Sequence, residues 1–367
     1  MIKRIIITTL LLSLIFGKSI LGHLNDVAAK SRIEEELSAL KYDDIIETSN
    51  AYLENYNESN GYYGVYNYWL GLNIPSPLEI YTITSEDVTG GNIVAIEDSF
   101  GYDKSTVEVN PTETITFSVD VEHEGLYEFY IDNYLKEETL LRPSLSVSIN
   151  GLVQYNEMYN LELPMKWEIN NEKTFDRFGD EITPNSSLKN EWSNFGLTDP
   201  NYFFVEPIKF FLNEGVNEIS ILVNEGYILF GDISIGNLYI DAPTYSEYSS
   251  SVSSNPKASG LLTIPAEGYT YESKQNIRAK FERDPNLTPY SYKNRVLNVL
   301  DQSSFRKSGD SVSYTFDVAE AGLYNISLKY LQSQNEGLAT SRLIKIDGEI
   351  PFDSLESYSI PYSRKYA

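Results

Sequence analysis

The sequence contains no cysteine and only two histidines among its 367 residues. The missing thiols exclude disulfides, and with so little histidine both thiol catalysis and the usual histidine-bearing zinc sites lack their residues. The histidines are His23 and His123, and no Gly-x-Ser-x-Gly motif accompanies them, so a Ser-His-Asp triad lacks its usual setting. No glycine-rich loop followed by a phosphate-binding lysine occurs either. Several common catalytic and nucleotide-binding chemistries therefore lack their residues in this chain.

Basic residues are also scarce, because 28 Lys and Arg stand against 53 Asp and Glu and the formal net charge is −25. A surface of this sign repels phosphate backbones, and no cluster of Lys or Arg interrupts it. We therefore expect neither nucleic acid nor an anionic membrane surface as a partner. The acidic residues leave one enzyme class open, since a glycosidase needs only two carboxylates. However, no segment outside the internal repeat is long enough for a separate catalytic domain, so we expect no enzyme.

The first 22 residues have the layout of a secretory signal. Lys3 and Arg4 supply the positive end, and an apolar run over 5–16 follows, with small residues after it for cleavage. The alternative is an uncleaved N-terminal anchor, although the run is short for a membrane-spanning helix. We expect no transmembrane segment beyond it. Export without cysteine, which also excludes a lipidated cysteine, predicts an extracellular or cell-surface location in a Gram-positive-type bacterium.

Residues 23–77 form the expected lead-in to the folded part of the chain. Apolar residues at three-to-four spacing and a capping-box pattern predict helical structure within 24–58. This part could pack on the following domain as an adaptor or act as a solvated spacer. The segment 59–76 is rich in aromatic residues and glycine, so it could present rings to a ligand or plug the edge of a β-sheet domain.

Aromatic residues make up 13% of the chain, a composition typical of folded β-rich proteins rather than disordered ones. The stretch 314–331 alternates apolar and polar residues on both sides of a bend at Gly322. This alternation predicts two half-buried antiparallel strands. The stretch 117–131 repeats the pattern around Gly125, which lies 197 positions earlier (322 minus 125).

The same offset persists further along the chain. Residues 147–155 match residues 344–352, and each copy carries Asn-Gly or Asp-Gly between two pairs of inward positions. These dipeptides favour the positive φ angles that a two-residue hairpin requires. Pro164 and Pro361 add a further match. The series predicts a duplicated β domain.

Short strands separated by turn signals predict an antiparallel β-sandwich for each copy. Within the first copy, further strands are expected over 210–223 and 227–235. We therefore expect an all-β chain with a short helical N-terminal lead-in. Its parts are a signal at 1–22, the lead-in at 23–77, module 1 at 78–242, a Ser-rich linker at 243–259 and module 2 at 260–367.

Module 2 is expected to be an incomplete sandwich. Ala367 matches position 170 of the first copy (367 minus 197), so module 2 lacks counterparts of the strands expected over 210–235. Natural proteins avoid the long unpaired sheet edges that would result. The expectation is either that the chain is a fragment of a longer one, which we favour, or that a partner or another segment completes the sheet.

Several of these features together resemble the non-catalytic carbohydrate-binding modules of the galactose-binding-like, jelly-roll β-sandwich type. They are the Gly125-Leu-Tyr bend, the Asn150-Gly hairpin, the turn at 215–217 and the closing strand at 231–235. Gly322-Leu-Tyr and Asp347-Gly look like the same elements in module 2. The resemblance covers roughly 78–240 and 260–367, and its motifs specify a fold far better than a ligand.

The tandem with its helical lead-in is most similar to the N-terminal region of large extracellular solute-binding proteins of sugar ABC transporters in Firmicutes-like bacteria. This resemblance implies a secreted protein that holds an oligo- or polysaccharide at the cell surface, with an ABC transporter permease as a further partner. The solute-binding domain of that family has no counterpart in this sequence and lies downstream in the look-alikes. Two alternatives stay open: a structural or adhesive surface module without sugar binding, and the accessory region of a glycoside hydrolase.

The resemblance also implies a structural Ca²⁺, because the opening strand of that family often carries a ligating Glu. Glu86 and Glu267 sit in matching contexts, and Asp232 takes the place of the acidic residue in the closing strand. Since Ca²⁺ takes six or more oxygen ligands, solvated surface carboxylates are the competing interpretation.

Flat aromatic rings are the expected sugar contacts, since they stack on the apolar faces of sugars. Trp192 is the first candidate because its neighbours on both sides are polar, and Trp167 and Tyr202 lie in the same irregular section. A core position is the competing interpretation for each ring. Further candidates are Tyr68 and Trp69 in the lead-in, and Tyr290, Tyr292 and Tyr358 in module 2.

Overall fold

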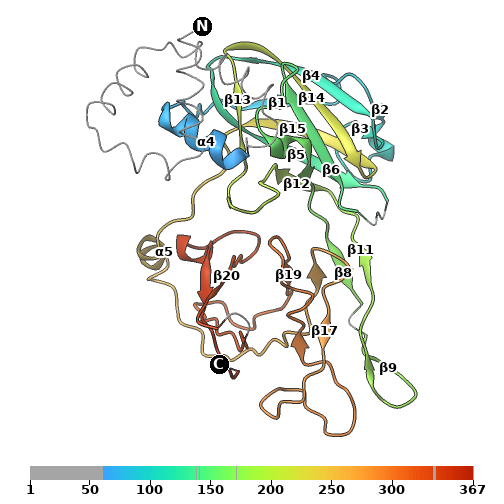
Figure 1. The fold of residues 1–367 in the computed structure, drawn as a ribbon, viewed down its shortest axis with the longest axis vertical. Coiled ribbons are helices and arrows are strands. Elements are labelled where there is room, and N and C mark those ends of the chain that lie inside the picture. Colours follow the sequence, from blue (N-terminus) through green and yellow to red (C-terminus); the bar gives the residue numbers. More distant parts are fainter. Residues whose placement is uncertain (1–60, 138, 140, 171, 334–335, 367) are drawn as a thin grey trace. The chain divides into compact units, whose positions relative to one another are not determined.

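The computed structural model of the protein describes residues 61–367, except 138, 140, 171, 334–335 and 367 (Figure 1). The predicted signal at 1–22 and the predicted helical region at 24–58 lie outside the described residues. Within the described part of the chain, no helix combines the length and the apolarity needed to cross a bilayer. The contacts divide the chain into two compact units. Unit 1 holds the residues up to Leu163 and Glu191–Asn237, and unit 2 holds Pro164–Asn190 and Leu238–Ala367.

Unit 1 contains a large antiparallel sheet with the strand order β12-β5-β15-β3-β2; β1 also pairs with β15, and β13 also pairs with β5 (Figure 1). The long strands β5 and β15 lie at its centre. The strands of this sheet are β1 (Tyr81–Ile83), β2 (Asn92–Val94), β3 (Thr106–Val109), β5 (Gly125–Leu135), β12 (Ser193–Gly196), β13 (Lys209–Leu212) and β15 (Ile228–Gly236).

A second antiparallel sheet of unit 1 has the order β4-β14-β6-β7. Its strands are β4 (Thr114–Val121), β6 (Ser144–Ile149), β7 (Leu161–Glu162) and β14 (Gly215–Glu225). Burial alternates along β4, so that Phe117 and Val119 face inward while their neighbours reach solvent. Phe117 lies opposite Ile219 of β14, which in turn lies opposite Ile149 of β6. This alternation is the pattern of a sheet with one face on the core.

The core of unit 1 contains apolar side chains of both sheets. Phe129 on β5 and Phe210 on β13 stack with ring centroids 4.4 Å apart, and both are fully buried. Ile115 on β4 and Ile221 on β14 are buried as well. The expected β-sandwich is confirmed for unit 1, and the strands predicted over 210–223 and 227–235 are present as β13, β14 and β15.

Both copies of the predicted hairpin adopt the same backbone conformation. Asn150 and Gly151 have φ angles of 53° and 75°, and Asp347 and Gly348 have φ angles of 52° and 88°. Positive φ at two successive residues is the requirement of a type I′ turn, which Asn and Asp tolerate and glycine favours. The duplication inferred from the sequence thus extends to the turn geometry.

The two bends at the glycines are also built alike. Tyr127 donates its hydroxyl to the carbonyl oxygen of His123, and Tyr324 does the same to Glu320, each at 2.6 Å. A Cβ on Gly125 would lie 2.5 Å from a side-chain carbon of Pro77, so the preceding segment passes directly over the bend.

The helix α4 (Tyr62–Gly71) lies in the segment for which two interpretations were open. Its residues Tyr62, Val65 and Trp69 are buried. Tyr62 meets Tyr155 edge-on with ring centroids 4.9 Å apart, and its hydroxyl accepts the backbone N–H of Lys209 at 2.9 Å. The segment therefore covers part of the sandwich and does not present these buried rings to solvent.

Unit 2 consists of short strands in small sheets. The largest has the order β11-β8-β16-β19. The strands are β8 (Trp167–Ile169), β9 (Thr174–Phe175), β10 (Glu181–Ile182), β11 (Ser186–Leu188), β16 (Tyr271–Glu272), β17 (Ala279–Lys280), β18 (Val299–Leu300), β19 (Val312–Ser313), β20 (Thr340–Arg342) and β21 (Tyr358–Ile360).

The segment 164–190 belongs to unit 2, whereas the sequence analysis assigned it to module 1. The reason is pairing: β8 lies antiparallel to β16, with Trp167 opposite Glu272 and Glu168 opposite Tyr271. Ile169 packs with Tyr269 and Ile277 in one buried cluster. The polar, irregular composition of 164–190 shows no apolar periodicity, so the sequence does not predict these short strands.

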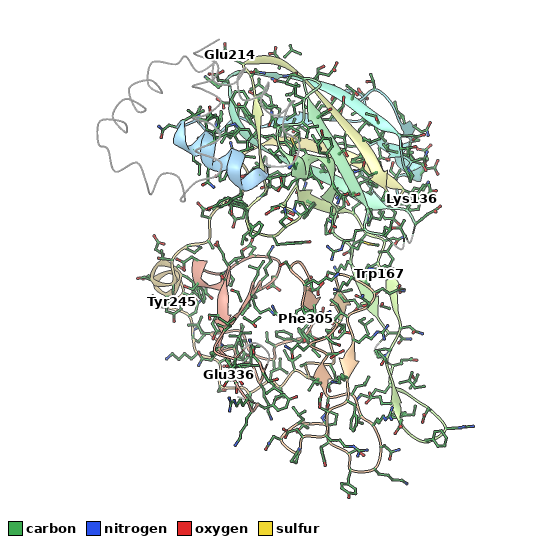
Figure 2. The ribbon with its side chains drawn as sticks, viewed as in Figure 1. Lys136, Trp167, Glu214, Tyr245, Phe305 and Glu336 are labelled. Carbon is green, nitrogen blue, oxygen red and sulfur yellow. The ribbon has the colours of Figure 1, made fainter. Side chains whose placement is uncertain are left out.

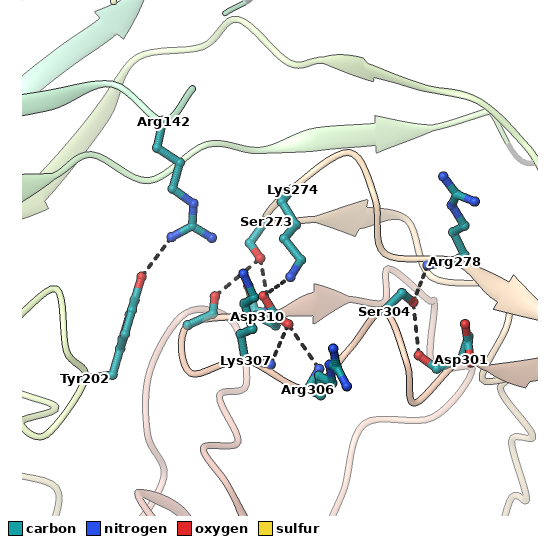
Figure 3. Close-up of polar contacts among 12 residues, drawn as sticks. Arg142, Tyr202, Ser273, Lys274, Arg278, Asp301, Ser304, Arg306, Lys307 and Asp310 are labelled. Carbon is teal, nitrogen blue, oxygen red and sulfur yellow. Dashed lines mark hydrogen bonds and ion pairs between the residues drawn. The ribbon is translucent and has the colours of Figure 1, made fainter. Parts of the chain in front are cut away.

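Two further local structures complete unit 2. The helix α5 (Tyr245–Ser251) occupies part of the predicted linker and begins with a capping box, in which Thr244 and Glu247 bond each other's backbone and side chain. The buried carboxylate of Asp310 accepts the backbone N–H groups of Arg306 and Lys307 and pairs with Lys274 (Figure 3). The capping box and the bonds of Asp310 each hold a loop of unit 2 in place.

Candidate functional site

The outer face of the large sheet of unit 1 carries the candidate site. Side chains alternate along β5, so Asp132 and Tyr134 lie on the face opposite to Phe129 and Ile131. The latter pair is fully buried in the core. The loop between β2 and β3 supplies the residues that cover this outer face.

A β-bulge on β15 shapes the same face. The register between β15 and β5 shifts between Phe230 and Ile233, so Gly231 and Asp232 together lie opposite Asp132. A Cβ on Gly231 would lie 2.5 Å from Cζ of Tyr102. Because glycine has no Cβ, the Tyr102 ring can lie against the backbone at this position.

Tyr102 is fixed through its hydroxyl. The hydroxyl donates to Oδ2 of Asp132 at 2.6 Å and accepts the backbone N–H of Asp232 at 2.9 Å. Burial, together with the bond to Asp132, raises the pKa of Tyr102 well above its ordinary value. The phenol stays protonated and continues to donate at all physiological pH values.

Trp192 lies beside Tyr102, directly before β12. The centroids of the two rings are 4.4 Å apart, and the indole N–H donates to the carbonyl oxygen of Ser99 at 3.0 Å. The ring of Tyr134 lies 5.6 Å away on β5. Trp192 is half-buried, so one part of the ring packs on the protein and another part reaches solvent.

Phe100 extends this group of rings to the surface. Its ring stacks on Tyr134 with a centroid distance of 4.8 Å and an angle of 16°, and 55% of its surface is exposed. Its φ of 50° shows that the chain turns sharply there. We call Phe100, Tyr102, Tyr134 and Trp192 the aromatic cluster.

Polar side chains border the aromatic cluster. Asn194 on β12 donates to Oδ1 of Asp132 at 2.7 Å, opposite which it lies in the sheet. Asn194 is exposed, and this bond uses one of its two amide hydrogens and leaves its carbonyl oxygen. Lys104 pairs with Asp232, with Nζ and Oδ2 2.5 Å apart. The site thus combines solvent-facing ring surface with amide, carboxylate and ammonium groups.

Such an arrangement suits a neutral, hydroxyl-rich ligand with apolar faces. Exposed ring surface provides an apolar platform, and the neighbouring amide and carboxylate provide acceptors for hydroxyl groups. Asp132 already accepts from Tyr102 and Asn194, and Asp232 pairs with Lys104, so these carboxylates offer a ligand hydroxyl only their remaining lone pairs.

Tyr202, the second predicted ring in unit 1, lies in a separate loop. The loop is held by Asp199, which accepts the backbone N–H groups of Asn201 and Phe203. The hydroxyl of Tyr202 accepts a hydrogen bond from Arg142 at 3.0 Å (Figure 3). No ring contact joins Tyr202 to Trp192 within the described part of the chain, so the structure does not place these two candidates in one cluster.

Trp167, the third candidate, lies in unit 2 on β8 (Figure 2). It is buried with 3% of its surface exposed. Its indole nitrogen is also buried and has no hydrogen-bond partner among the described residues. Trp167 therefore has the position of a core residue and offers no face to a ligand.

The remaining rings divide by exposure. In the lead-in, Trp69 is buried, and burial raises the pKa of the half-buried Tyr68 to about 12. In unit 2, the exposed candidates are Tyr290, Tyr292 and Tyr358. Tyr290 and Tyr292 lie two positions apart in one loop and Tyr358 lies on β21, and no ring contact joins any of them among the described residues.

The three acidic residues predicted as calcium ligands lie on different elements. The carboxylate of Asp232 is neutralised by Lys104. Glu86 is exposed in the turn after β1, where Asp87 rather than Glu86 accepts the N–H and hydroxyl of Thr84. Glu267 lies in unit 2, where burial raises the pKa of its carboxyl. No group of three metal-ligating side chains among the described residues includes any of them.

Sequence reasoning found Trp192 but missed the residues around it. Tyr134 and Asp132 could have been found, because the alternation along 125–135 places both on the outer face of the predicted strand. Phe100 and Tyr102 could not, since the loop between β2 and β3 has no periodicity that fixes its path. The bulge at Gly231 could not be predicted either, because the sequence there continues an apolar strand.

No protein-family model matches the sequence, and no curated protein matches it. Among solved structures, the chain is similar to a GH26-CBM35 β-(1,4)-mannanase of Podospora anserina, with 16% identity and a TM-score of 0.28, over 46% of this chain and 30% of that one. It is also similar to a family 35 carbohydrate binding module from Clostridium thermocellum, with 16% identity and a TM-score of 0.24, over 43% of this chain and 97% of the module. A third is the CBM36-1 domain of a multidomain xylanase from a Trinervitermes trinervoides hindgut metagenome, with 10% identity and a TM-score of 0.26, over 44% and 100%. The match thus spans less than a third of the mannanase chain.

Proposed function

We propose that unit 1 is a non-catalytic carbohydrate-binding domain whose ligand site is the aromatic cluster. The observation that carries this proposal is the position of Trp192 and Phe100. Both reach solvent on the outer face of the large sheet, beside the exposed amide of Asn194 and the carboxylate of Asp132. Apolar ring surface next to hydroxyl acceptors is the combination that sugar binding requires.

The site is prepared for a ligand before one arrives. The indole of Trp192 is oriented by its bond to Ser99, and the ring of Tyr102 by its bonds to β5 and β15. A ligand that stacks on fixed rings loses less affinity to side-chain ordering than one that must first arrange them. The strong acidity of the whole chain favours neutral over anionic glycans.

The proposal is tested by titrating a panel of neutral oligo- and polysaccharides into the chain by calorimetry. For a glycan that binds, Trp192→Ala and Phe100→Ala should each weaken the affinity about tenfold or more, which corresponds to about 1.4 kcal/mol. Tyr202→Ala is the matched control, because Tyr202 is an exposed ring of the same unit outside the aromatic cluster. An equal loss in Tyr202→Ala, or unchanged affinity in Trp192→Ala, would contradict the proposed site.

A structural or adhesive module is the second candidate function. It is favoured by the bond between Trp192 and Ser99, since a ring engaged in this way also anchors the loop between β2 and β3. In that case no glycan of the panel binds, and Trp192→Ala exposes this loop to proteolysis without changing any affinity.

We further propose that the protein acts at the cell surface in sugar uptake. This finer proposal is supported by the resemblance of the tandem and its lead-in to the upstream region of sugar-transport receptors. Protease treatment of intact cells should remove the protein if it is exported. Disruption of the gene should slow growth on the glycan bound in the titration but leave growth on glucose unchanged; slower extracellular hydrolysis of that glycan would instead indicate a glycosidase partner.

A further inference from the structure

A second group of chemically active side chains lies in unit 1, apart from the aromatic cluster. Glu79, Glu122 and His123 bring one nitrogen and two carboxylate oxygens within 4.8 Å of one another. Glu79 lies in the segment just before β1, and the other two lie in the bend between β4 and β5. Nδ1 of His123 is 3.0 Å from Oε1 of Glu79.

The backbone that carries this group is firmly held. The hydroxyl of Tyr127 donates to the carbonyl oxygen of His123 at 2.6 Å, and the N–H of Glu122 donates to the hydroxyl of Tyr81 at 2.9 Å. Tyr81 is itself paired with Ile235 in the large sheet. The three side chains thus project from fixed positions on two segments, as the ligands of a preorganised site do.

The charges of the group are not balanced by the protein. Two carboxylates face a single imidazole, and no Lys or Arg forms an ion pair with either carboxylate in the part of the chain that the structure describes. In addition, Oε2 of Glu79 is buried and has no hydrogen-bond partner there. A buried carboxylate oxygen without a partner is unfavourable, and a bound cation would supply that partner.

We propose that Glu79, Glu122 and His123 bind a divalent transition-metal ion, with Zn²⁺ as the best-fitting ion. Imidazole nitrogen with carboxylate oxygen is a typical zinc donor set, and water completes the coordination. Ca²⁺ is the weaker fit, because it is held by oxygen ligands alone. Ligand atoms around tetrahedral Zn²⁺ lie about 3.4 Å apart, so small rotations of the two exposed side chains close the site.

A metal here would clamp the segment before β1 to the bend between β4 and β5. The chain already crosses this bend closely, since the carbonyl oxygen of Pro75 accepts the N–H of Leu126 at 2.9 Å. The clamp would therefore stabilise the native path of the chain rather than change it. Its effect would be seen as an increase in the thermal unfolding temperature of unit 1 with Zn²⁺ concentration.

The test is a calorimetric titration of ZnCl₂ into the untagged, chelator-treated chain. One equivalent of Zn²⁺ should bind, and His123→Ala, Glu79→Gln and Glu122→Gln should each weaken the binding about tenfold or more. Glu97→Gln is the matched control, because Glu97 is an exposed carboxylate outside this group. Because the chain has only two histidines, NMR of the imidazole signals identifies the ligand, and only the signal lost in His123→Ala should shift with Zn²⁺.

Three results would overturn the proposal. They are unchanged zinc affinity in His123→Ala, a zinc-dependent shift of the His23 signal alone, and tighter binding of Ca²⁺ than of Zn²⁺ in the same titration. His123 and Glu122 are exposed, so their substitution should leave the fold intact, and thermal unfolding of the metal-free variants verifies this.

Discussion

Unit 1 and unit 2 contain the same sequence pattern in the same order, but they bury it to very different extents. Phe129 in unit 1 is fully buried, whereas Ile326, 197 positions later, is 63% exposed. Val121 and its counterpart Val318 differ in the same way, with 1% and 51% of their surfaces exposed. The bends at Gly125 and Gly322, which lie between these positions, are nevertheless built alike in the two units.

The difference lies in the strands that cover the pattern. In unit 1, β4 pairs with β14, and β5 pairs with β13 and β15. In unit 2, of the stretch 312–318 only Val312 and Ser313 form a strand, paired with β16. Turn geometry is thus a local property that the repeated residues determine by themselves. Burial is a property of the partner strands, which lie far away in the sequence.

The largest expected effect tests this comparison at one repeat position. Phe129→Ala should destabilise unit 1 by about 3–5 kcal/mol, because it removes a fully buried ring that stacks on Phe210. Ile326→Ala should change the stability by less than about 0.5 kcal/mol, because the side chain is exposed. Urea unfolding followed by circular dichroism measures both.

A loss of several kcal/mol in Ile326→Ala would break the comparison. It would mean that the alternating face of unit 2 is covered in solution. Dependence of that loss on protein concentration would then identify a second copy of the chain as the cover.

The next effect concerns a buried carboxyl in unit 2. Burial raises the pKa of Glu272 to about 7 from an ordinary 4.5, although Ser186 donates to its Oε1 at 2.8 Å. The folded state therefore holds the proton more tightly than the unfolded chain does. The stability of unit 2 is then complete below about pH 4.5 and is lost as the pH rises through about 7, by up to about 3 kcal/mol.

Glu272→Gln should remove this dependence, because the amide imitates the protonated carboxyl. Thermal unfolding at pH 5 and pH 8 gives the comparison for the wild-type chain and the variant. If the wild-type chain is equally stable at both pH values, Glu272 ionises in the folded state without the expected cost.

A smaller effect is expected at the two bends. Gly125→Ala should cost about 2 kcal/mol, since its Cβ would lie 2.5 Å from Pro77 and 2.7 Å from the carbonyl oxygen of Pro75. Gly322→Ala should cost less, because the nearest atom, the carbonyl oxygen of Pro256, would be 2.8 Å away. Gly64→Ala in α4 is the control, because its Cβ meets open space, and it should stabilise the helix by about 1 kcal/mol. Denaturant midpoints rank the three, and equal costs at both bends would show that unit 2 holds its bend as firmly as unit 1.

The fold of unit 1 could be predicted from the sequence to a large extent, for physical reasons. The period of two along 114–121 and the Asn150-Gly turn are local signals, and each specifies its own structure. The short strands β8 and β11 could not be predicted, because two or three residues show no periodicity and β8 is defined by pairing with β16. The contacts of these short strands group 164–190 with unit 2, although the sequence pattern favours module 1.

The candidate site was predictable only in part. Trp192 is recognisable as a large ring among polar neighbours, and the structure gives it partly exposed surface. Trp167 stands between Lys166 and Glu168 in the sequence but is buried. Its strand β8 pairs with β16, where the opposite residue, Glu272, lies 105 positions further along the chain (272 minus 167). The surroundings of Asp232, a predicted calcium ligand, also depend on a residue far away in the sequence. Lys104 neutralises the carboxylate of Asp232 across a separation of 128 residues.

The division of the chain has a consequence for any attempt to isolate its parts. Unit 2 begins at Pro164, before unit 1 has received β12, β13, β14 and β15, and it resumes only after Asn237. During synthesis, the strands β8 to β11 of unit 2 therefore leave the ribosome before the central strand β15 of unit 1. No single cut separates the two units, and a recombinant fragment ending at the predicted module boundary would carry 164–190 without the strand β16 that pairs with it.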